Sequence, residues 1–346
     1  MRWFCVMAIV GGLIAPAIAQ ENPGVSLASA IQRTVEDELS MKTLGGGQFW
    51  GDVVFFHGWH IQQNVFTKHY RLLDEHDNRH ASGTLEQCRE KLDQIKGDRK
   101  LPPMSGRGVV LVHGILRSSK CMNAMAETLK AAGYIPFQFD YPSTQVSIPD
   151  AAEYLHQTIE SLAGIEELSI VAHSMGGLVS RAYFAEHHDP RLHRVVMLAT
   201  PNHGAELADL VHQIFLVRAA AGPGGRQLVT DAKGLIPSLP VPKCEFAIIA
   251  GARNNPAGWN PLIPGDDDGT VTVASTRLVG AADFSTVHAP HTSILRNRAA
   301  IEQTLRFLSE GRLQADRAAV AITDKPEPMA NVTSPAAPSP APSAQE

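Results

Sequence analysis

The chain has 346 residues and a formal net charge of −5, and its lysine and arginine residues are scattered rather than gathered in one stretch. This length is enough for one large α/β domain with its own core. The acidic balance and the absence of a basic cluster make nucleic acid an unexpected partner.

Both ends of the chain have compositions that predict segments outside the folded body. Residues 1–19 combine a basic residue, an apolar run and small residues ending in Ala19, which is the pattern of a signal peptide cleaved after that alanine. We therefore expect a secreted or periplasmic protein. Residues 20–40 are predicted to be loosely attached, and 313–346, rich in Ala, Pro and Ser, to form a disordered tail. The folded domain is then 41–312.

The first part of this domain favours strands. Residues 49–61 and 66–73 are rich in β-branched and aromatic types between polar turns, which predicts an N-terminal β-hairpin. A helix is expected over 84–95. Residues 107–112 form a continuous apolar run, typical of a strand buried on both faces of a parallel sheet.

Strands and helices then alternate regularly, which predicts βαβ units and a mostly parallel, doubly wound α/β sheet. Residues 205–240 interrupt the alternation and predict a small cap insertion. The expected strands are 135–139, 168–172, 194–198, 245–250 and 281–287, and the expected helices are 118–132, 148–162, 175–187 and 297–308.

A serine stands where a predicted strand meets a predicted helix. Ser174 lies between the small residues Ala172 and Gly176, in the pattern AxSxG. Small residues let a strand and a helix close around a strained turn that exposes a nucleophilic hydroxyl. The simpler alternative is a helix N-terminus that Ser174 caps.

Three consecutive aspartates follow the serine at the place in the chain where a catalytic acid is expected: Asp266, Asp267 and Asp268. We favour Asp268, because Gly269 lets the loop turn this carboxylate toward a histidine. The alternative interpretation of the aspartates is a solvated acidic turn or a cation site.

The expected general base is His291, which follows the last predicted strand and precedes the closing helix. This position lies at the carboxyl edge of the sheet, where ligands collect. His288 competes for the role. His57 and His60 are not expected to bind a metal, since their side chains would face opposite ways along a strand.

An acyl-transfer site also needs N–H donors for the oxyanion. The residue after the serine, Met175, supplies one by its position. His113 and Gly114 directly follow an early predicted strand, and the next amide, that of Ile115, is the expected second donor.

Taken together, these motifs resemble a bacterial secreted lipase or esterase of the α/β-hydrolase fold. The resemblance covers about residues 107–310 and depends on the joint order of the motifs, which also include Thr200 to Gly204 and Thr292. It implies that Ser174 attacks an ester carbonyl, that His291 accepts the serine proton and that Asp268 orients the imidazole. No metal or organic cofactor is implied, and the role of residues 40–100 is open.

The motifs are compatible with several alternatives. The same acyl-enzyme chemistry serves an acyltransferase, and a noncatalytic hydrolase-like binding or surface protein is the alternative of another class. The implied partner is an ester or lipid substrate. A lipid interface is a further candidate partner, and no protein partner is implied. Apolar residues in 207–217 predict either a lid or a packed cap helix.

Three cysteines lie outside the predicted signal peptide: Cys88, Cys121 and Cys244. They allow at most one disulfide.

Overall fold

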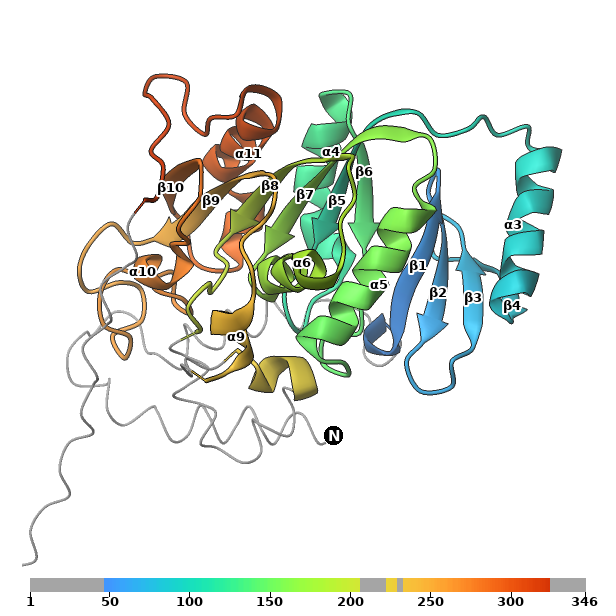
Figure 1. The fold of residues 1–346 in the computed structure, drawn as a ribbon, viewed down its shortest axis with the longest axis horizontal. Coiled ribbons are helices and arrows are strands. Elements are labelled where there is room, and N and C mark those ends of the chain that lie inside the picture. The colour runs from blue at the N-terminus through green and yellow to red at the C-terminus, as the bar shows by residue number, and fades with distance from the viewer. Residues whose placement is uncertain (1–46, 206–221, 229–232, 324–346) are drawn as a thin grey trace, which may run out of the picture.

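The computed structural model describes residues 47–205, 222–228 and 233–323 (Figure 1). The predicted signal peptide, the loose segment 20–40 and the predicted lid 207–217 lie outside these ranges. In the part of the chain that is described, no helix is long and apolar enough to cross a membrane. The thiols of Cys88, Cys121 and Cys244 are free.

A six-stranded sheet forms the centre of the domain, and all its pairings are parallel. This confirms the predicted fold class. The strand order is β10-β9-β8-β7-β5-β6, so β7 lies inside the sheet with neighbours on both sides. The strands are β5 (Gly106–Val112), β6 (Ile135–Phe139), β7 (Ile165–His173), β8 (Leu192–Leu198), β9 (Glu245–Ala252) and β10 (Asp283–His288).

Helices cover both faces of this sheet, because alternate side chains of each strand point to opposite sides. Val110 and Val112 of β5 join the apolar cluster under α5 (Ile148–Ser161) and α6 (Met175–Glu186). Val109 and Leu111 join the cluster under α4 (Asn123–Ala131) and α11 (Arg298–Glu310). Short helical turns complete the domain: η1 (Gly47–Phe49), η2 (Ser119–Met122), η3 (Ser293–Arg296), α9 (Leu235–Ser238) and α10 (Val273–Thr276).

The predicted N-terminal hairpin is instead a four-stranded antiparallel sheet beside β6 (Figure 1). The expected strand 49–61 is two strands, because His57 and Gly58 both have positive φ, at 49° and 91°, and form a two-residue turn. The sequence signal for such a turn is commonly Asn-Gly, and His-Gly replaces it here. The sheet consists of β1 (Trp50–Phe56), β2 (Trp59–Asn64), β3 (Tyr70–Leu73) and β4 (Arg79–Gly83), followed by α3 (Leu85–Asp98).

One buried aspartate joins this sheet to the central one. The Asp52 amide donates to the carbonyl of Asp140 just after β6, at 2.9 Å, and the Asp140 amide donates to Asp52 Oδ2, at 2.7 Å. Asp52 Oδ1 lies 2.7 Å from Nδ1 of His60, and the Asp52 carbonyl accepts from Thr158 of α5. The antiparallel sheet is therefore anchored to both β6 and α5.

The prediction of disorder from residue 313 onward is wrong for 313–323. Leu313 is fully buried, and its amide donates to Asp283 Oδ2 at 2.7 Å. Ile322 is also buried, and its amide donates to the Ala281 carbonyl at 2.9 Å. Two apolar residues thus anchor a segment whose average composition is that of a disordered chain. The rest of the predicted tail lies outside the described residues.

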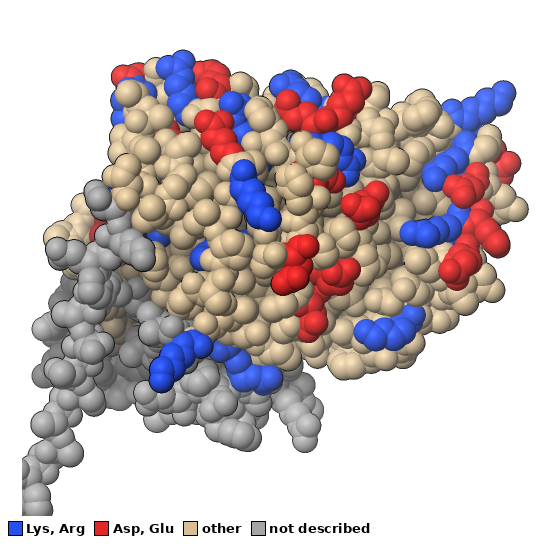
Figure 2. Space-filling model, viewed as in Figure 1, with Lys and Arg blue, Asp and Glu red and all other residues tan. Residues whose placement is uncertain are grey.

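Charged side chains of both signs are interspersed on the face seen in Figure 2. An arginine of α6, in contrast, is buried, and within the described residues it has no carboxylate partner. The Arg181 guanidinium donates to the carbonyls of Asn202, Ile236, Leu239 and Pro240. Burial lowers the Arg181 pKa to about 10, so the group stays charged at neutral pH. These hydrogen bonds hold the carboxyl end of the predicted cap region against α6.

Replacing this arginine tests how strongly it holds the cap region. In Arg181→Ala the free energy of unfolding should fall by about 3 kcal/mol, because several buried carbonyls lose their donor. Urea denaturation measures the change. Arg298→Ala is the matched control, since Arg298 pairs with Glu302 on an exposed helix face and its loss should leave the midpoint unchanged. Equal midpoints for the two variants would contradict the assigned role of Arg181.

Candidate active site

Ser174 occupies the tight turn between β7 and α6. Its backbone has φ 54° and ψ −127°, a conformation that non-glycine residues rarely adopt and that costs about 1–3 kcal/mol. Hydrogen bonds hold the turn on both sides: the Ser174 amide donates to Leu198 O at 2.9 Å, and the Gly177 amide donates to Ser174 O at 3.0 Å. The predicted strand, sharp turn and helix are therefore present, and no side-chain cap hydrogen bond links Ser174 to the helix.

The small residues around the turn have different roles. A Cβ on Gly176 would overlap the carbonyl oxygen of Val112, and one on Gly177 would overlap the Thr200 side chain. Ala172 is fully buried within β7, where the sheet accommodates its methyl group. The departure of position 172 from glycine therefore leaves the turn intact, whereas position 176 requires glycine.

The structure brings together the three residues expected to carry the reaction. His291 Nε2 lies 3.0 Å from Ser174 Oγ, and His291 Nδ1 lies 2.7 Å from Asp268 Oδ2. The Asp268 side chain is fully buried, and its Oδ1 accepts from the amides of Thr270 and Val271 at 3.0 and 2.8 Å. The His291 amide also donates to Asp268 O at 2.8 Å, so backbone and side chain fix the pair together.

The parallel sheet with helices on both faces and the position of Ser174 in a tight turn between a strand and a helix are those expected from the sequence. The chain has the α/β-hydrolase fold. Residues 79–230, less than half of the chain, match a family model described as a domain of unknown function (DUF7379). A comparison with curated proteins finds no match.

Solved structures with a similar fold include three bacterial or metagenomic proteins. The lipase BlEst2 of Bacillus licheniformis, in its mature form, is 23% identical, with 58% of this chain and 90% of that chain covered and a TM-score of 0.43. The lin2722 gene product of Listeria innocua is 17% identical, with 64% of this chain and 100% of that chain covered and a TM-score of 0.42. The metagenomic carboxyl esterase MGS0156 is also 17% identical, with 55% of this chain and 66% of that chain covered and a TM-score of 0.42. These similarities are too distant to assign a reaction to this chain.

The other two aspartates of the 266–268 run organise the loop around Asp268. Asp266 accepts from the backbone amides of Arg253 and Asn254, at 2.9 and 3.1 Å. Asp267 is fully buried, and burial raises the pKa of its carboxyl. Its Oδ1 accepts from three backbone amides, those of Trp259, Asn260 and Gly269. Of the three, only Asp268 is hydrogen-bonded to His291.

His288, the competing base, points to a different neighbour. Its ring lies 5.1 Å from the Trp259 ring, at the exposed end of β10. His60 packs in β2 against Asp52, and His57 lies in the turn before it. None of these three histidines is hydrogen-bonded to Ser174.

The loop after β5 passes directly beside the serine. A Cβ on Gly114 would lie 3.0 Å from the Ser174 Cβ, so this glycine permits the close approach. Within the described residues no hydrogen bond uses the Ile115 amide, and Met175, as the first residue of α6, has no helical acceptor for its N–H. Among the described residues, neither of the two expected oxyanion donors therefore has an acceptor.

A buried histidine that the sequence interpretation missed supports His291. His173 Nε2 lies 3.0 Å from the His291 carbonyl oxygen, and because a carbonyl only accepts, this nitrogen carries the proton. Burial lowers the His173 pKa well below its usual range, so the ring is neutral. Its place directly before Ser174 is the only signal in the sequence, and the bond to a residue 118 positions away could not be foreseen.

A second histidine holds the loop that carries the expected oxyanion donor Ile115. His113 is fully buried, and its Nδ1 donates to the Gly114 carbonyl at 2.7 Å. Burial lowers the His113 pKa, which favours the neutral ring. Tyr141 donates its hydroxyl to the His113 carbonyl at 2.8 Å. Two hydrogen bonds therefore hold the loop that carries Ile115: one from the His113 side chain to the Gly114 carbonyl, and one from Tyr141 to the His113 carbonyl.

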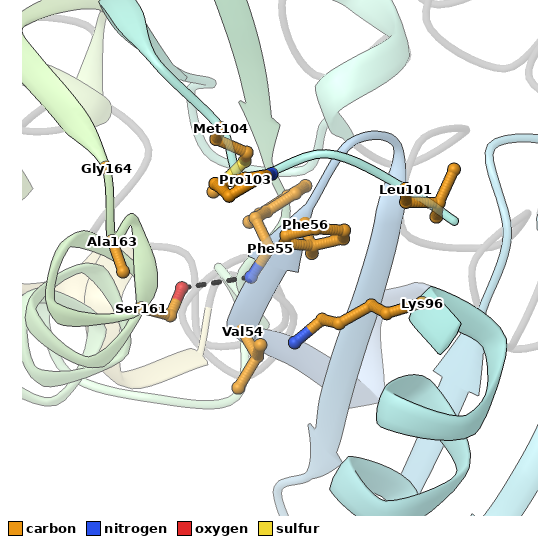
Figure 3. Close-up of a pocket in the computed structure, with 10 residues that line it drawn as sticks. All are labelled: Val54, Phe55, Phe56, Lys96, Leu101, Pro103, Met104, Ser161, Ala163 and Gly164. Carbon is orange, nitrogen blue, oxygen red and sulfur yellow. Dashed lines mark hydrogen bonds between the residues drawn. The ribbon is translucent and has the colours of Figure 1, made fainter. Parts of the chain in front are cut away.

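A pocket of about 380 Å³ lies away from this site (Figure 3). Val54 and Phe56 of β1, Lys96 of α3 and Gly164 are among its lining residues. Gly164 immediately precedes β7, whereas Ser174 follows it, so the two places lie at opposite ends of a strand roughly 30 Å long. This pocket is not part of the candidate active site.

The two buried histidines should make the protein sensitive to mild acid. In the unfolded chain both titrate near pH 6.5, while in the folded chain burial keeps them neutral. The stability from both neutral rings is therefore fully present well above pH 6.5 and is lost as the pH falls below it, with a slope that approaches about 1.4 kcal/mol per pH unit for a histidine that stays neutral in the folded chain.

The variant His173→Gln should remove one of these two contributions, because glutamine does not titrate. Urea denaturation at several values between pH 6.5 and 5.5 measures the slope of the free energy of unfolding. His76→Gln, on an exposed side chain, is the control and should leave the slope unchanged. An unchanged slope in His173→Gln would refute the assignment of His173 as buried and neutral.

Proposed function

We propose that this protein is a serine hydrolase that cleaves carboxylic esters through an acyl-enzyme intermediate. The observation that carries the proposal is the position of His291 between Ser174 Oγ, at 3.0 Å, and Asp268 Oδ2, at 2.7 Å. A serine hydroxyl needs an adjacent base, and the base needs a partner that fixes its tautomer. Both requirements are met around a serine held in a strained turn.

The reaction follows from these contacts. Asp268 accepts a hydrogen bond from Nδ1–H of His291, which leaves Nε2 unprotonated. Nε2 takes the proton of Ser174 as the serine oxygen attacks the ester carbonyl. The amides of Met175 and Ile115 donate to the oxyanion. Protonated His291 then gives its proton to the departing alkoxide, and a water activated by the same histidine hydrolyses the acyl-serine and restores the hydroxyl.

The surroundings favour an acyl ester as substrate. Leu116 follows the oxyanion loop residue Ile115 and is 41% exposed, with a positive φ of 61°. Trp259 and Leu262, on the loop that leads to Asp268, are also exposed. Apolar side chains exposed on the loops that carry catalytic groups suit a hydrocarbon acyl chain better than a charged one.

Replacing the serine tests the proposal directly. Ser174→Ala should lower the hydrolysis of a short p-nitrophenyl ester by at least about 10³-fold, because the nucleophile is lost. A fluorophosphonate probe should label the native chain and not the variant. Ser309→Ala, on an exposed serine near the end of α11, is the control and should keep both activity and labelling.

Two outcomes would change the proposal. Absence of both turnover and labelling in the native chain would favour a noncatalytic binding protein. Acyl transfer to an added alcohol that outruns hydrolysis would favour an acyltransferase, because the acyl-enzyme is common to both reactions.

The acid can be tested against its own neighbour. Asp268→Asn should lower kcat by about 10³- to 10⁴-fold, because the neutral amide no longer stabilises the imidazolium and its NH₂ group favours the wrong tautomer of His291. Asp266→Asn should keep activity within about tenfold, since its amide oxygen can still accept a backbone N–H. The same ester assay measures both, and similar losses in the two variants would contradict the choice of Asp268.

A further inference from the structure

A cluster of three potential metal ligands lies where α5 meets the end of α6. Glu153 and His156 stand three residues apart on α5, and His187 directly follows α6. One ligand atom from each of the three lies within 4.8 Å of the others. His187 Nε2 is 3.1 Å from Glu153 Oε2, and the His156 and His187 rings stack with their centroids 3.7 Å apart.

The polar atoms of this cluster are incompletely satisfied. His156 Nδ1 is buried and has no hydrogen-bond partner in the described part of the chain. A buried polar nitrogen without a partner is unfavourable by about 1–3 kcal/mol. The centroid of the Tyr183 ring lies 5.4 Å from that of the His187 ring and 6.2 Å from that of the His156 ring. Tyr183 therefore borders the cluster on the α6 side.

We propose that Glu153, His156 and His187 bind a divalent transition-metal ion of the Zn²⁺ type. Two imidazoles and one carboxylate are a donor set that Zn²⁺ commonly takes, with water in the fourth position. The Glu153 side chain is half exposed and that of His187 is one-fifth exposed, so an ion can reach the site from solvent.

Coordination requires the imidazole rings to rotate. The stacked rings are almost parallel, with an angle of 5° between them, so their nitrogen lone pairs lie in separate planes. Rotation of the His187 side chain, which directly follows α6, reorients the lone pairs of its own ring, and rotation of His156 reorients those of the other ring. Glu153 is one helical turn from His156 on the same helix face, and its ligand atom already lies within 4.8 Å of those of both histidines.

The metal site is separate from the reaction proposed above. Ser174 directly precedes α6 and His187 directly follows it, so a helix of 12 residues, roughly 18 Å long, lies between them. The ion would join α5 to the carboxyl end of α6 and stabilise the contact between these helices. Its binding therefore does not depend on whether the chain hydrolyses esters.

Titration of the untagged, EDTA-treated chain with Zn²⁺ in a calorimeter tests this site. The native chain should bind one high-affinity equivalent, and the Tm should rise by about 5 °C at a Zn²⁺ concentration about 100-fold above Kd. His156→Ala and His187→Ala should each lose this equivalent and the rise in Tm. Glu153→Gln, a surface change that leaves the fold intact, should weaken binding by about 10- to 100-fold.

The neighbouring His188→Ala is the matched control and should bind Zn²⁺ like the native chain. Circular dichroism and the ester assay show that each variant is folded. Substitution with Co²⁺ gives an independent readout, because a four-coordinate site produces visible absorption bands that the histidine variants should lack. The proposal is overturned if the native chain binds no stoichiometric Zn²⁺, or if all three ligand variants bind it as His188→Ala does.

Discussion

The strained turn at Ser174 is the constraint on which the site depends. A positive φ at a non-glycine residue persists only where the surrounding structure enforces it. Here the enforcement comes from two inner strands and a helix: Leu198 of β8 accepts the serine amide, and Val112 of β5 leaves room only for a glycine at position 176. The sheet thus holds the hydroxyl toward His291 before any substrate arrives.

A chain of buried polar groups extends this rigidity to the N-terminal sheet. Asp52 holds the backbone of Asp140, and the Asp140 carboxylate accepts from the amide and hydroxyl of Ser119 and lies 3.6 Å from His113 Nε2. His113 in turn fixes the carbonyl of Gly114, beside the serine. The antiparallel sheet, for which the sequence indicated no role, therefore stabilises the edge of the domain that carries the loop of Gly114 and Ile115.

The predicted strands and helices between residues 84 and 308 that fall within the described residues have counterparts in the structure. Long apolar runs and helical periodicity specify such buried strands and amphipathic helices locally. The predictions differ from the structure where one or two residues determine the local conformation against the average composition of their segment. The His57–Gly58 turn divides a strand that its composition predicts as continuous. Leu313 and Ile322 anchor a segment whose average composition indicates disorder.

The sequence by itself determined the strand, turn and helix around Ser174 and the order in which serine, acid and histidine follow, because these depend on neighbouring residues and on chain order. Only the tertiary structure decided which of three adjacent aspartates is hydrogen-bonded to His291. It also decided that His173 donates to the His291 carbonyl. Those contacts join residues 23 and 118 positions apart. They arise because parallel strands bring their carboxyl ends to one edge of the sheet, which no local pattern encodes.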